Sequence, residues 1–422
     1  MSERLPRLRM NLDFQPSPME DRPGLLIRDS LGYSDLTLII PPALVSCLQL
    51  LDGEATDLDL RQELVRLTGN LEVGELSGHL LQSLSQAGFL EDEVYTQLRE
   101  EKHRAFAESP VRTASHAGAA YPLEADALRA GLAEILDHGG QTSGRKGLTG
   151  IAAPHVSFEG GHACYRAAFG ALGPELRDRT FVILGTSHQG QPEKFGLTRK
   201  PFSTPLGEAS TACELVDELS RKAAGAVLME DYCHSIEHSI EFQVLLLQHL
   251  FGPSVRIVPI LCGAYASSLV EGGRPEDDPG VSLFLDSLRE VASREGERLF
   301  WVLGIDLAHL GHRYGDPFPV VAERGEMLRV AEQDRARLGL VAAGDAGAFW
   351  DSVRRDSDPL RWCGASVLYT FMRALPGARA EVLRYEQWNI DDRSVVSFGA
   401  LAFSSAPIPG PTPSSSPAAG VP

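Results

Sequence analysis

The chain has 422 residues, of which 43% are hydrophobic, so it is long enough to bury more than one core. Its formal net charge of −18 argues against nucleic acid and anionic membrane surfaces as partners, because both are bound through Lys and Arg. The sequence contains neither a membrane-spanning apolar run nor an apolar segment after its charged first residues, so we expect a cytoplasmic protein.

Residues 1–92 predict a small α+β domain. Two apolar runs around a Gly-Tyr-Ser-Asp turn in residues 24–40 predict a hairpin, and helical patterns follow over 42–53, 57–70 and 73–90. This order resembles a winged helix, in particular the PqqD-like peptide-binding domains. The last helical segment carries no Lys or Arg, which disfavours DNA binding. A domain that serves packing alone is the alternative to a peptide-binding one.

Charged residues 93–110 predict a helical linker, and the Pro-, Ser- and Gly-rich residues 406–422 predict a disordered tail. We expect the main domain between them, over residues 111–405. Its apolar runs lack alternation, as is typical of strands buried on both faces; they cover residues 147–155, 179–188, 254–263 and 297–309.

Helical patterns over 241–252 and 281–294 separate these strands. The alternation predicts an α/β domain with a central, mostly parallel sheet flanked by helices. Residues 380–388 and 394–403 predict two late strands that pair antiparallel.

Three of the predicted strands end on polar side chains: the first at His155, the second at His188, and a third passes Asp306 to reach His309. Ligand sites in α/β sheets form outside the carboxyl ends of strands, so we expect these residues to converge. We expect the glycines after His155 to let the backbone approach a ligand. One histidine at a strand end is more often structural, but three such endings favour a shared site.

Two other segments supply candidates. His238 and Glu241 lie three residues apart, on one face if a helix begins there. The alternative is a helix N-terminus at which Glu237 and Glu241 stabilise the dipole. Cys363 precedes an apolar helical pattern, and a helix N-terminus favours the thiolate, which is the nucleophilic and metal-binding form. Cysteine spacing indicates reduced thiols, and we interpret the other five as small buried hydrophobes.

Six motifs occur in the order that the Memo family shows, and they cover nearly all of residues 111–405: SHAGAAYP at 115–122, APH at 153–155, LGTSH at 184–188, EHSIEFQ at 237–243, IDLAHLG at 305–311 and WCG at 362–364. The resemblance implies a fold similar to class III extradiol dioxygenases and a metal pocket with His155, His188 and Cys363 as ligands. It further implies that five residues line this pocket: His116, His238, Glu241, Asp306 and His309.

Bacterial members resemble component B of AmmeMemoRadiSam systems, which implies an Ammecr-type protein and a radical SAM protein as partners. The chain departs from the family pattern in two places. Val-Ser-Phe follows APH where a Gly-Tyr pair is frequent, and Gln189 stands where many members have a second histidine. The N-terminal domain is also absent from short members.

Two imidazoles and one thiolate leave an open coordination position on a metal ion. Imidazole suits iron, copper and zinc, and thiolate favours copper, so we expect iron or copper, with zinc as the alternative. The leading hypothesis is a redox-metal protein for oxidation or for metal and oxygen handling, with His238 or His309 as acid or base. Glu241 or Asp306 could join the metal ligands or orient a ligand by hydrogen bonding.

Three alternatives stay open. A true extradiol dioxygenase would use Glu241 or Asp306 as an iron ligand in place of Cys363. A zinc hydrolase would use the same ligands to acidify bound water. A partner-binding protein with a vestigial pocket would not be an enzyme at all.

Overall fold

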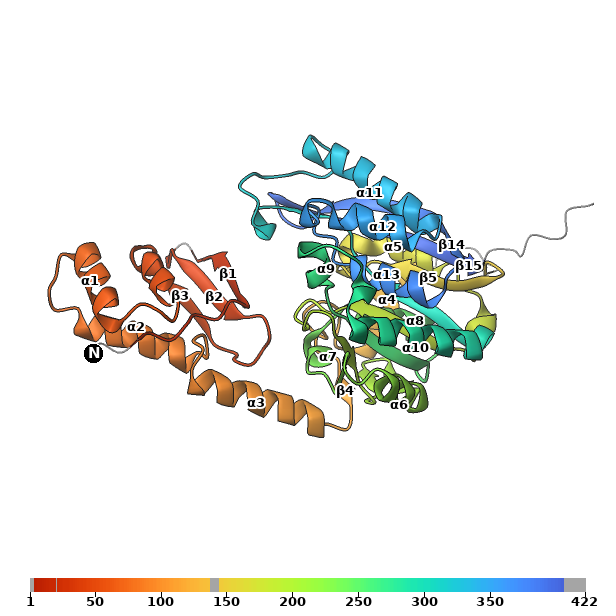
Figure 1. Cartoon of the computed structure of the whole chain (residues 1–422), viewed down its shortest axis with the longest axis horizontal. Helices are drawn as coiled ribbons and strands as arrows, with labels where there is room; N and C mark the ends of the chain where they lie inside the picture. Colours follow the sequence, from red (N-terminus) through yellow and green to blue (C-terminus); the bar gives the residue numbers. More distant parts are fainter. Residues whose placement is uncertain (1–3, 20, 137–143, 406–422) are drawn as a thin grey trace, which may run out of the picture. The chain divides into compact units, whose positions relative to one another are not determined.

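The computed structural model describes residues 4–19, 21–136 and 144–405 (Figure 1). The chain divides into two compact units, Met1–Arg112 with Glu230–Ile236, and Thr113–Met229 with Glu237–Pro422. The domain boundaries expected from the sequence stay predictions, and the expected tail at 406–422 lies outside the described residues. We find no helix in the described ranges whose length and hydropathy would allow it to cross a membrane.

The first unit contains a small antiparallel sheet in the order β1-β2-β3. The predicted hairpin is confirmed as β2 (Leu25–Asp29) and β3 (Thr37–Ile40), and β1 (Leu12–Pro16) is a strand that was not predicted. Four helices follow: η1 (Pro42–Leu50), which is a 3-10 helix, α1 (Asp57–Thr68), α2 (Gly74–Gln86) and α3 (Glu93–Glu108).

A buried ion pair organises this unit. Arg9 Nη2 lies 2.9 Å from Asp29 Oδ1, and neither side chain is exposed by more than 1%. Arg9 also donates to the Gly88 carbonyl oxygen (2.8 Å), and Asp29 accepts from the backbone N–H of Tyr33 (3.0 Å). Because breaking such a pair costs about 3–5 kcal/mol, it fixes the start of the chain, β2 and the turn after α2 in one arrangement.

The segment Glu230–Ile236, which includes α7 (Cys233–Ile236), packs within the first unit. Tyr232 stacks on His103 of α3 with ring centroids 4.7 Å apart, and on Tyr33 at 5.2 Å. The first unit is therefore completed by a stretch that lies far along the chain.

The strands of the second unit that the sequence predicted are β5 (Leu148–Ala153), β6 (Thr180–Thr186), β11 (Arg256–Cys262) and β12 (Leu299–Gly304), followed by β14 (Ala378–Asn389) and β15 (Ser394–Ser405). The remaining elements of this region are β4 (Arg112–Thr113), α4 (Ala125–Leu136), α5 (Phe158–Phe169), η2 (Pro174–Leu176), β7 (Phe195–Leu197), β8 (Phe202–Thr204), β9 (Gly207–Thr211), α6 (Cys213–Lys222), β10 (Val227–Met229), α8 (Glu241–Phe251), α9 (Ala266–Val270), η3 (Pro275–Asp277), α10 (Pro279–Glu295), η4 (Gly296–Arg298), β13 (His309–Gly311), η5 (His312–Tyr314), α11 (Glu326–Ala342), α12 (Ala346–Arg354), η6 (Arg355–Ser357) and α13 (Ala365–Ala374).

The central sheet is mixed and mostly parallel, which confirms the predicted α/β class. Its order is β13-β15-β5-β12-β6-β11-β9-β8-β4, and β5, β12, β6 and β11 are mutually parallel neighbours. The late strands β14 and β15 pair antiparallel, as predicted. The edge order was not predicted, because short strands such as β7 and β13 leave little pattern in three residues.

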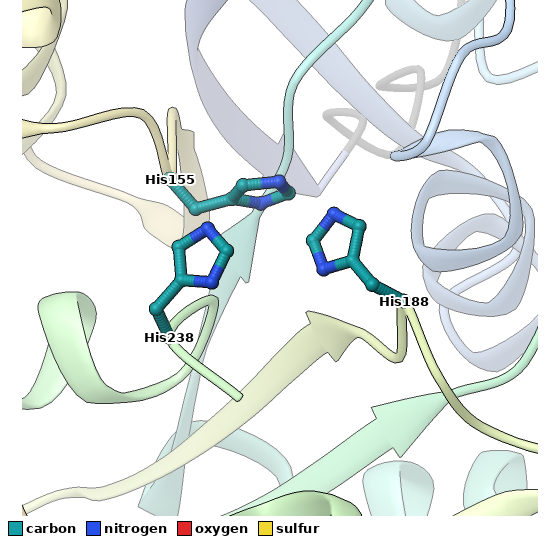
Figure 2. Close-up of side chains that lie close together, drawn as sticks. All are labelled: His155, His188 and His238. Atoms are coloured by element: carbon teal, nitrogen blue, oxygen red, sulfur yellow. The ribbon is translucent and has the colours of Figure 1, made fainter. Parts of the chain in front are cut away.

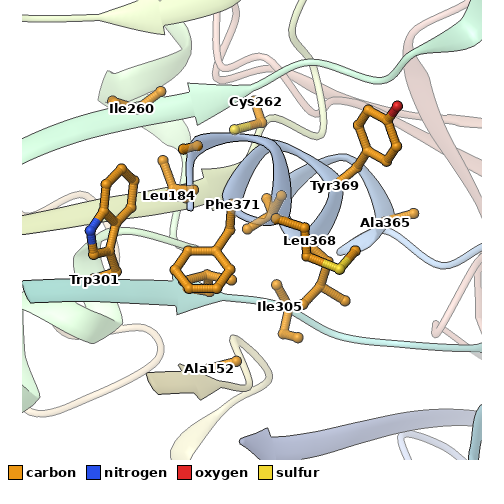
Figure 3. Close-up of a cluster of buried hydrophobic side chains, with 14 of the residues drawn as sticks. Ala152, Leu184, Ile260, Cys262, Trp301, Ile305, Ala365, Leu368, Tyr369 and Phe371 are labelled. Carbon is orange, nitrogen blue, oxygen red and sulfur yellow. The ribbon is translucent and has the colours of Figure 1, made fainter. Parts of the chain in front are cut away.

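Helices cover both faces of this sheet. In β6, Val182 and Leu184 belong to the apolar cluster under α13, whereas Phe181 stacks on Phe251 of α8 at 5.4 Å. Helix α13 contacts β6, β11 and β12, and Figure 3 shows its apolar side chains lying over these strands. The alternation along β6 explains why the strand is apolar throughout: each face meets a helix.

Candidate metal centre

Three strand ends meet at the site. His155, Asp306 and His188 each lie two residues beyond the last residue of β5, β12 and β6. Gly304 pairs with Ala153 on one side and Gly185 on the other, so the three strands end at one level. The expected convergence of these residues at the carboxyl edge of the sheet is observed.

The His155 ring is fixed by its backbone surroundings. Its Nδ1 donates to the carbonyl oxygen of Gly304 (3.1 Å), and its backbone N–H donates to Asp306 Oδ1 (3.0 Å). The other ring nitrogen, Nε2, lies 3.4 Å from both Cys363 Sγ and Asp306 Oδ2. This Nε2 therefore faces the Cys363 thiol and the carboxylate of buried Asp306.

One carboxylate orients two further histidines. Glu237 Oε2 accepts from the backbone N–H and from Nδ1 of His188, at 3.1 and 3.0 Å. Its Oε1 accepts from the backbone N–H of His238 (2.8 Å) and lies 3.2 Å from His238 Nδ1. With each Nδ1 held in this way, the Nε2 atoms of both rings are left for another partner.

The three imidazoles form a compact group. Figure 2 shows the rings of His155, His188 and His238 turned toward one another from three different backbone segments. His188 and His238 stack nearly parallel with centroids 5.3 Å apart, and His155 stands edge-on to both at 5.0 and 5.2 Å.

Two glycines bring His238 to the strand ends. A side chain at Gly304 would collide with the backbone of Ser239, and one at Gly185 with the Ser239 side chain. Ser239 Oγ donates to the carbonyl oxygen of Thr186 (2.9 Å), which fastens the crossing segment to β6. Glycine at both positions therefore permits the close crossing that carries His238 over the sheet edge.

Cys363 lies two residues before α13, as expected from the sequence, and it is partly exposed. Burial alone would raise the pKa of its thiol. The neighbouring imidazoles of His155 and His309 have the larger combined effect and lower this pKa to about 5. Burial lowers the pKa of His155, and the negative charges of Asp306 and Cys363 raise it to about 9. In such a pair of thiolate and protonated imidazole, a bound metal cation can take the place of the imidazole proton.

A second layer of carboxylates holds the cysteine loop. Asp358 Oδ2 accepts from the backbone N–H of Trp362 (2.6 Å), while Oδ1 accepts from buried Arg337 (2.7 Å). The Trp362 indole donates to Asp334 Oδ1 at 2.7 Å. The backbone of Arg361 has φ of 54°, and such left-handed geometry in a non-glycine residue persists only when its surroundings enforce it.

Two groups of side chains have ligand atoms within 4.8 Å of one another: His155 with His188 and His238, and His155 with Asp306 and Cys363. They share His155. Nitrogen and sulfur donors of this kind fit iron, copper or zinc and do not fit magnesium or calcium, which prefer oxygen.

The other predicted residues lie around this group. The His116 ring is 5.4 Å from that of His238, so His116 borders the histidine cluster. His309 Nδ1 lies 2.9 and 3.1 Å from the carbonyl oxygens of Leu307 and Arg361, which fixes its ring beside the cysteine loop. Their catalytic and pocket-lining roles stay predictions.

Glu241 is completely buried and serves a different segment. It accepts from the backbone N–H groups of Ser115 and His116 (both 3.1 Å) and from the hydroxyl group of Tyr121. These bonds tie the SHAGAAYP segment to the start of α8, and Glu241 is in neither ligand group. Its predicted catalytic role is untested.

One expectation is confirmed and one is corrected. The helical pattern expected over 241–252 is observed as α8, and His238 lies before this helix, where its backbone N–H donates to Glu237 and Ser239 bonds to β6. The glycines after His155 do not widen a ligand site: Gly160 and Gly161 lie in α5, where Gly160 packs against the Trp388 ring and Gly161 against Tyr165.

The role of Glu237 was not predicted, since its place in the sequence suggested only a partner of a helix dipole. A signal was present, since Glu237 directly precedes His238 in the EHSIEFQ motif. No such signal indicated the roles of Asp334 and Asp358. Asp334 is 28 residues from its partner Trp362 in the chain, and Asp358 binds the backbone of Trp362 across a turn.

In metal-free protein, iodoacetamide should alkylate Cys363 at nearly the same rate at about pH 8 and about pH 6. A thiol with a pKa of about 5 is mainly thiolate at both values, and the thiolate is the reacting form. Peptide mass spectrometry measures the rate, and Cys363→Ser identifies the peptide. A rate that falls about tenfold for each pH unit would contradict the lowered pKa.

Comparison with known proteins assigns the chain to a family. The family model described as "Memo-like protein" matches residues 112–402. A MEMO1 family protein of Aquifex aeolicus is 24% identical over 400 residues, which cover 92% of this chain and 98% of the relative, so the similarity must include most of the first unit. A MEMO1 family protein of Thermococcus kodakarensis is 29% identical over 309 residues, covering 69% and 99%. The chain belongs to the Memo-like protein family.

Proposed function

We propose that this protein binds a redox-active metal, iron or copper, through His155 Nε2, His188 Nε2 and Cys363 Sγ. The observation that carries the proposal is the orientation of both imidazoles. Each has its Nδ1 held by a backbone or carboxylate oxygen, which leaves Nε2 for a metal ion, and His155 Nε2 lies 3.4 Å from Cys363 Sγ. Metal-ligating histidines are held in this way through their second ring nitrogen.

Such a centre, when occupied, would supply one-electron chemistry for a small oxidation or for metal and oxygen handling. The residues around it have separate tasks in this proposal. Glu237 and Asp306 hold the ligand histidines in place, which preserves the geometry when a proton or substrate moves. His238 keeps its Nε2 available, and burial lowers its pKa, so it is suited to accept a proton.

The metal content of anaerobically purified protein tests the ligand set. We expect close to one iron or copper per chain in the wild type, and at most about a tenth of that in His155→Ala, His188→Ala and Cys363→Ala, since even loss of a supporting residue lowers metal affinity about 10–100-fold. Mass spectrometry of the elements in protein prepared without chelators or a metal column gives the count.

His162→Ala and Cys213→Ala are the matched controls, because both remove the same kinds of atom outside the ligand groups. They should retain the wild-type metal content. Full metal in all three ligand variants would refute the proposal. Zinc in place of iron or copper would move the function to hydrolysis by zinc-bound water.

A true extradiol-type dioxygenase is the second candidate, and the position of Asp306 favours it. Its Oδ2 lies 3.4 Å from His155 Nε2, so a carboxylate is available to replace the thiolate as a ligand. Two histidines and a carboxylate form the ligand set of non-haem iron oxygenases. We also propose that the fold resembles that of class III extradiol dioxygenases. The position of the site at the carboxyl ends of the parallel strands supports this.

This candidate predicts that Cys363→Ser loaded with Fe(II) still cleaves catechols, whereas Asp306→Asn does not. Absorbance measures ring opening for each catechol of a panel. His162→Ala, purified and loaded with Fe(II) in the same way, is the control. If neither the wild type nor Cys363→Ser shows turnover, this candidate is eliminated while the metal-binding proposal stands.

We also propose protein partners: an Ammecr-type protein and a radical SAM protein for the whole chain, and a peptide for the winged-helix-like first unit. Support comes from the Aquifex aeolicus relative, whose similarity extends into that unit, and from the three-stranded sheet there. With the full chain as bait, both candidate proteins should co-elute in size-exclusion chromatography. Separate elution of each would contradict the partnership and favour a first unit that serves packing alone.

A further inference from the structure

A cavity of about 210 Å³ lies beside the candidate metal centre. Its wall contains polar side chains, among them His188, Cys363 and Ser366, and the aromatic side chains of Trp350 and Trp362. A small molecule in this cavity would therefore contact two of the proposed metal ligands, a serine and aromatic rings at the same time.

The hydroxyl group of Ser366 is the polar group of this wall that the protein itself does not use. Only the backbone carbonyl oxygen of Ser366 accepts a hydrogen bond, from Thr370 Oγ1 (2.7 Å), and no described residue bonds to its Oγ. The residue as a whole is 6% exposed, but Oγ keeps surface that a water molecule can reach. A buried residue whose hydroxyl group faces a cavity in this way calls for a partner from outside the chain.

Ser366 lies in the first turn of α13, and no side chain caps the N-terminus of this helix. Backbone bonds run here from the N–H of Ala365 to Trp362 (3.1 Å) and from the N–H of Leu368 to Gly364 (3.0 Å). None among the described residues uses the N–H of Ser366. Unpaired N–H groups and the helix dipole attract an anion, so Ser366 offers one ligand an O–H and an N–H donor together.

The charges of the wall limit the anion. Of its charged residues, Asp358 is paired with Arg337 (2.7 Å), and His188 with the carboxylate that orients it (3.0 Å). The Cys363 thiolate has a cation beside it in either state, protonated His155 in metal-free protein and the metal ion once it binds. Since the described wall contains no Lys or Arg, a doubly charged group such as a phosphate is disfavoured. A carboxylate, with one charge and two acceptor oxygens, matches the two donors.

The volume limits the rest of the molecule. An engineered apolar cavity of about 150 Å³ holds one benzene molecule, so a cavity of about 210 Å³ fits one ring with a small substituent. Aromatic walls favour a flat ligand, which can stack on or meet the edges of the rings. The aromatic side chains of Tyr265 and Trp350 meet at 74° with centroids 5.6 Å apart, which fixes the shape of this part of the wall.

We propose that this cavity binds the substrate as a single-ring aromatic acid whose carboxylate accepts hydrogen bonds from the hydroxyl group and the N–H of Ser366. The inference deepens the proposed function and rests on it for the word substrate. The binding itself depends only on the cavity, on Ser366 and on the N-terminus of α13. Ser366 is a specificity residue in this proposal and takes no part in bond making.

Three probes test the inference on the full chain: benzoate, uncharged benzamide, which has nearly the same shape, and acetate, which lacks the ring. We expect benzoate to bind about tenfold more tightly than benzamide, because hydrogen bonds to a charged group are about twice as strong and the amide nitrogen has no acceptor oxygen to offer. Acetate should bind at least about tenfold more weakly than benzoate, since it leaves the aromatic wall empty. Ligand-observed NMR titrations give the dissociation constants on metal-loaded and on metal-stripped protein.

Ser366→Ala removes the hydroxyl group and keeps a residue that favours a helix, so the fold should be retained. Its affinity for benzoate should fall about tenfold, and its affinity for benzamide about threefold at most. Ser287→Ala is the matched control. Ser287 is also a buried helical serine, but it lies in α10 outside the cavity wall and bonds to the Leu283 carbonyl oxygen (2.7 Å), so both affinities should stay unchanged.

The outcomes separate this inference from the metal proposal. Metal content is measured on the same samples, and Ser366→Ala should keep it. Benzoate selectivity that depends on Ser366, in a protein that is purified without metal, would refute the proposed function and retain the binding site. Full metal content with equal affinity for benzoate and benzamide, or with unchanged benzoate affinity in Ser366→Ala, would overturn the inference. Benzoate binding that vanishes when the metal is stripped would assign the carboxylate to the metal and overturn it as well.

Discussion

The common level at which three parallel strands end is the constraint on which the site depends. Pairing of Gly304 with Ala153 and with Gly185 fixes the ends of β5, β12 and β6 in one row. Asp306 and the two strand-end histidines follow two or three residues past that row, so the sheet brings all three to one edge. A register shift in β12 alone would separate Asp306 from His155 and dismantle the group.

Carboxylates then fix the orientation of the histidines at and beside these strand ends. Glu237 reaches His188 and His238 with one oxygen each, and Asp306 binds the backbone N–H of His155. Asp358 and Asp334 do the same for the loop that ends at Cys363. The side chains of His155, His188, His238 and Cys363 come from four separate segments of the chain, and hydrogen bonds to neighbouring carboxylates and backbone hold them in place. A metal site or a reactive thiolate requires such fixed positions.

The sequence predicts the row of strand ends because apolar runs followed by His155, His188 and Asp306 are visible without any knowledge of the fold. It also predicts Cys363, through the helix that begins two residues later. It does not predict the Glu237 bridge, since a carboxylate that orients two histidines has the same local pattern as one at a helix start.

The central claim is that imidazole nitrogen and the Cys363 sulfur hold one metal ion. X-ray absorption at the metal edge, on the wild-type chain as purified, tests this most directly because sulfur and nitrogen scatter differently. We predict one sulfur at about 2.3 Å together with nitrogen or oxygen neighbours at about 2.0–2.1 Å, and loss of the sulfur shell in Cys363→Ser. A shell of nitrogen and oxygen alone in the wild type would contradict the claim and favour a site of histidines with Asp306.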